Sequence, residues 1–147
     1  MTAVRLILTI TAVALLGGCA VGNDAVRDLS TERLARTIVN DRTTIADVLG
    51  MLGEPDYEHR ESDGERMLHY SWTRGRPSAK NFIPFNPVAE YPMTQKTLRV
   101  RVDKTGVVRW HDFSGIFYIR RMPLIGADDT HSIRPLTDEE LNALADS

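Results

Sequence analysis

The stretch Leu98-Arg-Val-Arg-Val-Asp103, LRVRVD, decides the fold class of this chain. Its aliphatic residues alternate with arginine and aspartate, which is the period-two pattern of a strand with one buried and one solvated face. The next residues, Asp103-Lys-Thr-Gly106, predict a turn. The segment from Val107 to Phe113 predicts the returning strand, with Val108 and Trp110 on its apolar side. Together the two segments predict an antiparallel hairpin.

A third strand is predicted upstream, at Met67–Trp72, where alternate large side chains again share one face. Ser62-Asp-Gly64 before it is a turn signal. Downstream, Ile116-Phe-Tyr-Ile119 is expected to extend the sheet or to pack beneath it. The expected sheet is three-stranded and antiparallel, and its apolar face needs a cover.

The clearest helix signal follows Thr44. The Thr44 hydroxyl and the Asp47 carboxylate have the spacing of a capping box, which satisfies backbone amides at a helix start. Gly53 and Pro55 predict the end of this helix. Between these limits apolar residues recur at i, i+3, i+4 and i+7, which places them on one helical stripe. The stripe consists of Ile45, Val48, Leu49 and Leu52.

A shorter helix is predicted to begin after Ser30, which can cap its first turn, and to run to about Val39. A second capping box, from Thr137 to Glu140, predicts a short helix near the C-terminus. We therefore expect an α+β fold in which two N-terminal helices pack on a three-stranded antiparallel sheet, in the order α-α-β-β-β, followed by a C-terminal extension.

The first residues have the pattern of an export signal. Arg5 precedes an unbroken apolar or hydroxyl stretch from Leu6 to Leu16. As a helix this stretch would rise roughly 16 Å, about half of a bilayer core of about 30 Å, so a permanent transmembrane span is disfavoured. The sequence Leu16-Gly-Gly-Cys19 resembles the lipobox of bacterial lipoproteins, in which the signal is cut before the cysteine and that cysteine is lipidated.

This resemblance implies a lipid anchor on Cys19, the single cysteine of the chain. An ordinary secretory signal with a chance cysteine is the alternative. Ala20 follows the cysteine where inner-membrane lipoproteins often carry aspartate, so the resemblance points to the periplasmic face of the outer membrane. Several acyl chains together hold a protein on a bilayer without crossing it.

The chain length predicts one domain after the leader. We expect residues 1–18 to be the lipoprotein signal peptide and residues 19–29, which show no periodicity, to form a flexible tether. Residues 30–119 would form the α+β domain, and residues 120–147 a C-terminal tail with a short helix.

Residues 74–96, between two predicted strands, are long for a hairpin connection and carry four prolines among large apolar side chains. Aromatic and methionine side chains bury large areas on docking, and prolines reduce the ordering cost. The predicted partner-binding residues are Phe82, Ile83, Phe85, Tyr91 and Met93. The alternative is that this segment folds back and completes the core of the domain.

Patterns that carry catalysis are missing from the sequence. The four histidines lack metal-ligand spacing, and His111-Asp112 on a strand would point its side chains to opposite faces. A nucleophile elbow and a phosphate-binding glycine loop are absent, and Cys19 would be acylated. We therefore predict a protein that is not an enzyme and that needs no cofactor or metal. A formal charge of −2 without a basic block argues against nucleic acid as a partner.

Three elements taken together resemble the SmpA/OmlA, or BamE-like, family of outer-membrane assembly lipoproteins. They are Thr44-x-x-x-Val48-x-x-x-Leu52-Gly53-x-Pro55, the strand ending Tyr70-x-Trp72, and Leu98-x-Val100-x-Val102-Asp103-x-x-Gly106-x-Val108. The resemblance implies a sheet covered by a helical hairpin. It also implies a non-enzymatic accessory role in the machine that inserts β-barrel proteins into the outer membrane.

The expected function is therefore that of a protein-interaction lipoprotein, whose partners lie in the outer membrane or periplasm and include the barrel-assembly complex. An alternative is a stand-alone envelope lipoprotein that binds and inhibits a periplasmic hydrolase or senses envelope stress. A small-ligand or lipid carrier is disfavoured, because three strands and two short helices enclose little volume for a ligand.

Overall fold

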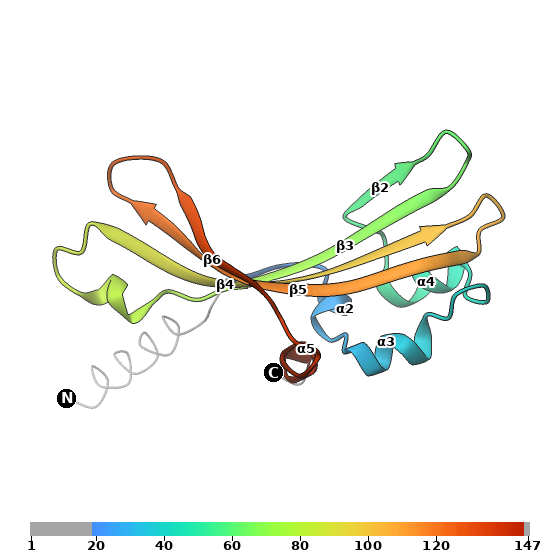
Figure 1. Ribbon diagram of the computed structural model, residues 1–147, viewed down its shortest axis with the longest axis horizontal. Helices are drawn as coiled ribbons and strands as arrows, with labels where there is room; N and C mark the ends of the chain where they lie inside the picture. The colour runs from blue at the N-terminus through green and yellow to red at the C-terminus, as the bar shows by residue number, and fades with distance from the viewer. Residues whose placement is uncertain (1–18, 146–147) are drawn as a thin grey trace, which may run out of the picture.

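The computed structural model describes residues 19–145, in which one antiparallel sheet carries helices on one face (Figure 1). The sheet has six strands in the order β1-β3-β4-β5-β6, and β2 pairs with β3 on the same edge as β1. The strands are β1 (Cys19–Gly22), β2 (Tyr57–Arg60), β3 (Arg66–Gly75), β4 (Val88–Val102), β5 (Val108–Pro123) and β6 (Asp129–Pro135). The helices are α2 (Asp24–Arg27), α3 (Thr31–Thr37), α4 (Ile45–Leu52), the 3-10 turn η1 (Ala79–Phe82) and α5 (Asp138–Ala145).

The predicted α-α-β-β-β fold with a three-stranded sheet was wrong. The sheet has six strands, and the short C-terminal helix that was predicted, α5, follows them. Strands β1 and β2 were missed because each has only four residues and is held by pairing with β3, a partner distant in the chain. Such pairing is a tertiary effect that a four-residue segment does not reveal by its own periodicity.

Strands β4 and β5 extend much further than predicted, and they are the two longest strands of the sheet. Residues 74–96, expected as a loop, contain the end of β3 and the first part of β4. Pro92 suggested a loop because proline cannot donate to a strand ladder. In the structure the Pro92 carbonyl accepts from the Arg76 amide at 3.1 Å, just beyond the point where β3 stops pairing with β4. The N–H that proline lacks would lie on this same side of β4, so its absence interrupts no strand pairing.

The three predicted helix starts, at Ser30, Thr44 and Thr137, are confirmed. The Thr44 side chain accepts from the Asp47 amide at 3.3 Å, and the Asp47 carboxylate accepts from the Thr44 amide at 2.8 Å. Hydrogen bonds from Thr44 lower the pKa of Asp47. Ser30 caps α3, and Gly53 ends α4 with a φ of 73°, which a glycine adopts without steric strain.

The core lies between these helices and the half of the sheet nearest to them (Figure 1). Of the predicted helical stripe, Val48 and Leu52 are buried, whereas Leu49 is half-buried. The sheet contributes alternate residues of β3 and β4 and the first residue of β5, as the period-two pattern predicted. These buried sheet residues are Leu68, Tyr70, Trp72, Leu98, Val100, Val102 and Val108.

One charged residue, Lys96, is fully buried at the centre of this face. Its ammonium nitrogen donates to the carbonyl oxygens of Arg27 at 2.7 Å and Leu29 at 3.0 Å, and it lies 6.0 Å from the centre of the Trp72 ring. The carbonyls at the end of a helix favour a cation. Lys96 therefore ties the end of α2 to the sheet.

The prediction that Val108 and Trp110 share the apolar side of their strand was wrong. Val108 pairs with Val102, whereas Trp110 pairs with Arg101, so one extra residue of β5 lies between the two pairs. Such a bulge reverses the alternation of faces. Val108 is buried, and Trp110 is exposed, 5.6 Å from the guanidinium of Arg99.

The outer parts of the described chain are more regular than the sequence suggested. Residues 19–29, expected as a tether, contain β1 and α2. Residues 120–147, expected as a tail with a short helix, contain that helix, α5, and in addition the end of β5 and β6. Gly115 leaves room for helix α5 and the segment before it. A side chain at position 115 would come within 2.7 Å of Leu136 and Leu141. The predicted signal peptide, residues 1–18, lies outside the described residues.

Candidate functional site

Residues 76–87 fold back along the edge of β4 at the end of the sheet farthest from β2 (Figure 1). Beyond Gly75 strand β3 no longer pairs with β4, and this loop takes its place. The Ser78 amide donates to the Glu90 carbonyl at 2.9 Å, and the Asn81 side chain bonds both backbone groups of Glu90, at 2.9 and 2.7 Å. The loop is therefore held to β4 by hydrogen bonds that a neighbouring strand would otherwise make.

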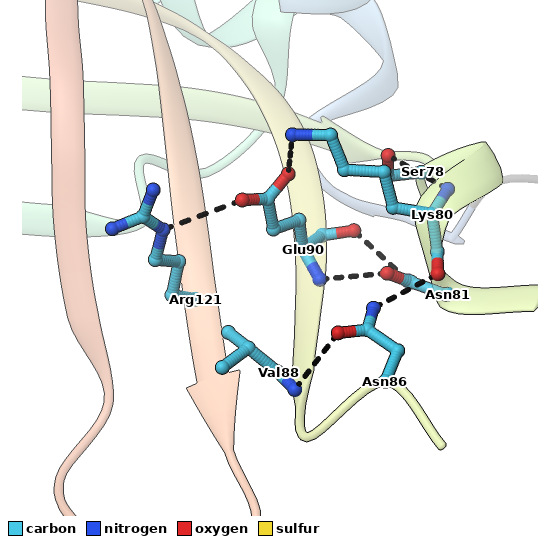
Figure 2. Close-up of polar contacts among 7 residues, drawn as sticks. All are labelled: Ser78, Lys80, Asn81, Asn86, Val88, Glu90 and Arg121. Atoms are coloured by element: carbon cyan, nitrogen blue, oxygen red, sulfur yellow. Dashed lines mark hydrogen bonds and ion pairs between the residues drawn. The ribbon is translucent and has the colours of Figure 1, made fainter. Parts of the chain in front are cut away.

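The Glu90 carboxylate adds ionic contacts to this framework. Figure 2 shows it between Lys80, at 3.0 Å, and Arg121 of β5, at 3.3 Å. Lys80, followed by Arg121, lowers the pKa of Glu90, so the carboxylate stays ionised. Asn86 closes the loop, because its side chain donates to the Lys80 carbonyl at 2.8 Å and accepts from the Val88 amide at 3.2 Å.

This framework presents apolar side chains to solvent. Phe82 and Ile83 are exposed, and Phe85 has a relative exposure of 102%. Phe85 also has a φ of 65°, a conformation that costs a bulky residue about 1–3 kcal/mol. Strained backbone positions of this kind cluster at binding and active sites, so Phe85 is a candidate residue for such a site.

A second turn, bonded to the end of this loop, exposes two more apolar residues. Leu124 and Ile125, between β5 and β6, are 83% and 93% exposed, and the Leu124 amide donates to the Pro87 carbonyl at 3.0 Å. Sequence reasoning missed this pair, although two large aliphatic residues between Pro123 and Gly126 were a signal. We call the combined surface the apolar tip; it consists of Phe82, Ile83, Phe85, Leu124 and Ile125.

The other two predicted partner-binding residues lie elsewhere. Tyr91 and Met93 are half-buried on β4 and line a groove of about 430 Å³ on a face of the sheet. Phe82, Ile83 and Phe85 are thus exposed on the loop, whereas Tyr91 and Met93 line the groove. We call this hollow the sheet groove; it is lined by Val21, Thr73, Gly75, Pro77, Tyr91, Met93, Arg120 and Met122.

The predicted lipidation site, Cys19, is the first residue of β1 and pairs with Gly75. This pairing places the backbone of residue 19 beside Gly75, which lines the sheet groove. Lipidation of Cys19 stays a prediction.

The histidine that the sequence paired with an acidic neighbour has structural contacts. His111 Nδ1 lies 2.9 Å from Asn40 Oδ1, and burial lowers the pKa of the ring. Asp112 instead contacts Arg99 at 2.7 Å. Within residues 19–145 there is no cluster of three metal-ligating side chains, and no helix of this part is long and apolar enough to span a membrane.

Comparison of the chain with protein-family models, curated proteins and solved structures finds no match. Membership of the SmpA/OmlA family therefore stays a prediction that depends on the residues quoted above.

Proposed function

We propose that this protein is a lipid-anchored, non-enzymatic interaction module at the periplasmic face of the outer membrane, and that it assists the assembly of β-barrel proteins. The apolar tip is its protein-binding surface. The observation that carries the proposal is Phe85, which is fully exposed, has a positive φ and lies in a loop fixed by hydrogen bonds.

The tip has the physical properties of a docking surface. Large apolar side chains supply most of the binding free energy at protein interfaces, and they do so best when their backbone is already ordered. Here the Asn81 and Glu90 contacts order the loop before any partner arrives, and the Leu124 amide bonds it to the neighbouring turn. Little conformational entropy is then lost on docking.

The location and the biological process come from the sequence. The segment Leu16-Gly-Gly-Cys19 supports a lipid anchor, and Ala20 supports the outer membrane. The resemblance to the SmpA/OmlA family supports a role beside the barrel-assembly complex. In this proposal the tip contacts a protein component of that complex.

Affinity purification of the full-length protein from detergent-solubilised outer membranes tests the proposal. The tip variant carries Phe82→Ser, Ile83→Ser and Phe85→Asn, since asparagine tolerates a positive φ. The control is Tyr57→Ser, which removes an exposed aromatic ring of β2, a strand that lies far from the loop in Figure 1.

We expect barrel-assembly components to co-purify with the wild type and the control and to be lost from the tip variant. Equal recovery with the tip variant would contradict the role of the tip. Recovery of a soluble periplasmic hydrolase in place of assembly components would contradict the assembly role and favour the inhibitor function.

A further inference from the structure

The sheet groove lies on the face of the sheet opposite the helices. Tyr70 and Trp72 of β3 point into the core, so Thr73 and Gly75, which line the groove, belong to the other face. Its volume of about 430 Å³ falls within the range of about 300–1,000 Å³ found for small-molecule sites.

The chemistry of the lining favours an apolar and flexible occupant. Valine, proline, tyrosine and two methionines surround the groove, and methionine adapts its shape to flexible ligands. Arg120, the charged residue of the lining, is already paired with Asp128 at 2.6 Å. The Met93 side chain lies against Gly75, where an added Cβ would come within 2.5 Å of the Met93 sulfur.

The predicted attachment site of the lipid is on a strand that borders the groove. Residue 19 pairs with Gly75, and Val21 pairs with Thr73. Of these residues, Val21, Thr73 and Gly75 line the groove. Neighbouring strands lie about 4.8 Å apart, so a lipid on residue 19 would start beside the groove. The ladder between β1 and β3 also leaves no flexible tether at this point, which keeps the lipid and the groove together.

We propose that one acyl chain of the lipid on Cys19 lies in the sheet groove, while the remaining chains stay in the bilayer. This inference rests on the lipid anchor of the proposed function. Attachment at residue 19 gives the chain a high effective concentration at the groove. Two chains in the leaflet suffice for stable anchoring, so a third chain is free to bind the protein. The bound chain would fix the orientation of the domain and hold its groove face against the membrane surface.

Photo-cross-linking of the lipidated protein in native membranes tests this assignment. Cells incorporate a fatty acid with a diazirine near its end, the membranes are irradiated, and the purified protein is digested and analysed by mass spectrometry. We expect the fatty acid to become cross-linked to the protein molecule that carries it, on peptides that contain Met93 and Met122.

Charged substitutions give the matched comparison. Met122→Glu, at an exposed groove position, and Met93→Glu should each lower the yield of these cross-links about ten-fold, because an acyl chain does not accept a buried charge beside it. Ile133→Glu, at an exposed position of β6 outside the groove, should leave the yield unchanged. Circular dichroism establishes that each variant is folded.

The outcomes separate the two proposals. An unacylated mature terminus would overturn the lipid anchor and this inference together. An acylated terminus whose cross-links reach only phospholipid, or protein segments outside the groove, would overturn the groove assignment and leave the anchor intact. Equal yields from wild type and Met122→Glu would also overturn it.

Discussion

Asn81 bonds both backbone groups of Glu90: its amide nitrogen donates to the Glu90 carbonyl at 2.9 Å, and its side-chain oxygen accepts from the Glu90 amide at 2.7 Å. One side chain thereby replaces a strand neighbour at the edge of β4. The same contact fixes the loop that carries Phe82 and Phe85 (Figure 2). The rigidity of the apolar tip depends on this pair.

Replacing Asn81 with alanine should loosen the tip without unfolding the domain. Each lost hydrogen bond contributes about 0.5–1.5 kcal/mol, so we expect a loss of about 1–3 kcal/mol in the free energy of local opening. Hydrogen exchange of the backbone amides of residues 78–90 should become faster. The control Asn40→Ala removes a contact with His111 instead. Unchanged exchange of residues 78–90 in Asn81→Ala would contradict the role of this pair.

Replacing Lys96 with methionine should destabilise the whole domain. Two carbonyl oxygens, of Arg27 and Leu29, would lose a buried donor, and an unsatisfied buried polar group costs about 1–3 kcal/mol. Urea unfolding measures the loss. The exposed Lys104→Met should change the free energy of unfolding by less than about 0.5 kcal/mol. Equal stability of Lys96→Met and wild type would mean that α2 needs no tie to the sheet.

The stability of the protein should fall in acid, in part because of Glu58. Hydrogen bonds from Arg66 and then Arg60 lower the pKa of Glu58 from 4.5 to about 2. A carboxylate with a lowered pKa in the folded state stabilises the protein above its unfolded pKa. That contribution is complete above pH 4.5 and is lost as the pH falls towards 2.

The measurement is the difference in unfolding free energy between wild type and Glu58→Gln at several pH values. The difference should be largest near pH 7 and should shrink steadily from pH 4.5 towards pH 2. A difference between wild type and Glu58→Gln that is independent of pH would refute the link to Arg66.

Replacing Cys19 with serine should release the protein from the membrane or stall it as a precursor, because serine cannot form the thioether to the lipid. The domain should remain folded, since β1 pairs with β3 through its backbone. Cell fractionation and circular dichroism check both points. Undiminished retention of the variant in the outer membrane would be incompatible with a lipid anchor on Cys19.

The sequence predicted those features that neighbouring residues determine. The capping box of Thr44 and Asp47, the Ser30 cap and the Asp103–Gly106 turn each need only a few consecutive residues, and all are present. The alternation in Leu98–Asp103 likewise identified the buried face of β4.

Features that depend on distant partners were not predictable in this way. Strands β1, β2 and β6 exist because they pair with longer strands. The bulge that exposes Trp110 depends on the register between β4 and β5. The tip was predicted in part: Phe82 and Phe85 stood out by residue type, whereas the contact with Leu124 required the fold.

Site-specific photo-cross-linking in living cells tests the proposed function most directly. A benzophenone amino acid replaces Phe85, or Tyr57 of β2 as the control. After irradiation, mass spectrometry identifies the protein joined to each position. We predict that position 85 cross-links to a component of the outer-membrane barrel-assembly complex and that position 57 does not. Cross-links from position 85 to lipid alone, or the same products from both positions, would contradict a protein-docking tip.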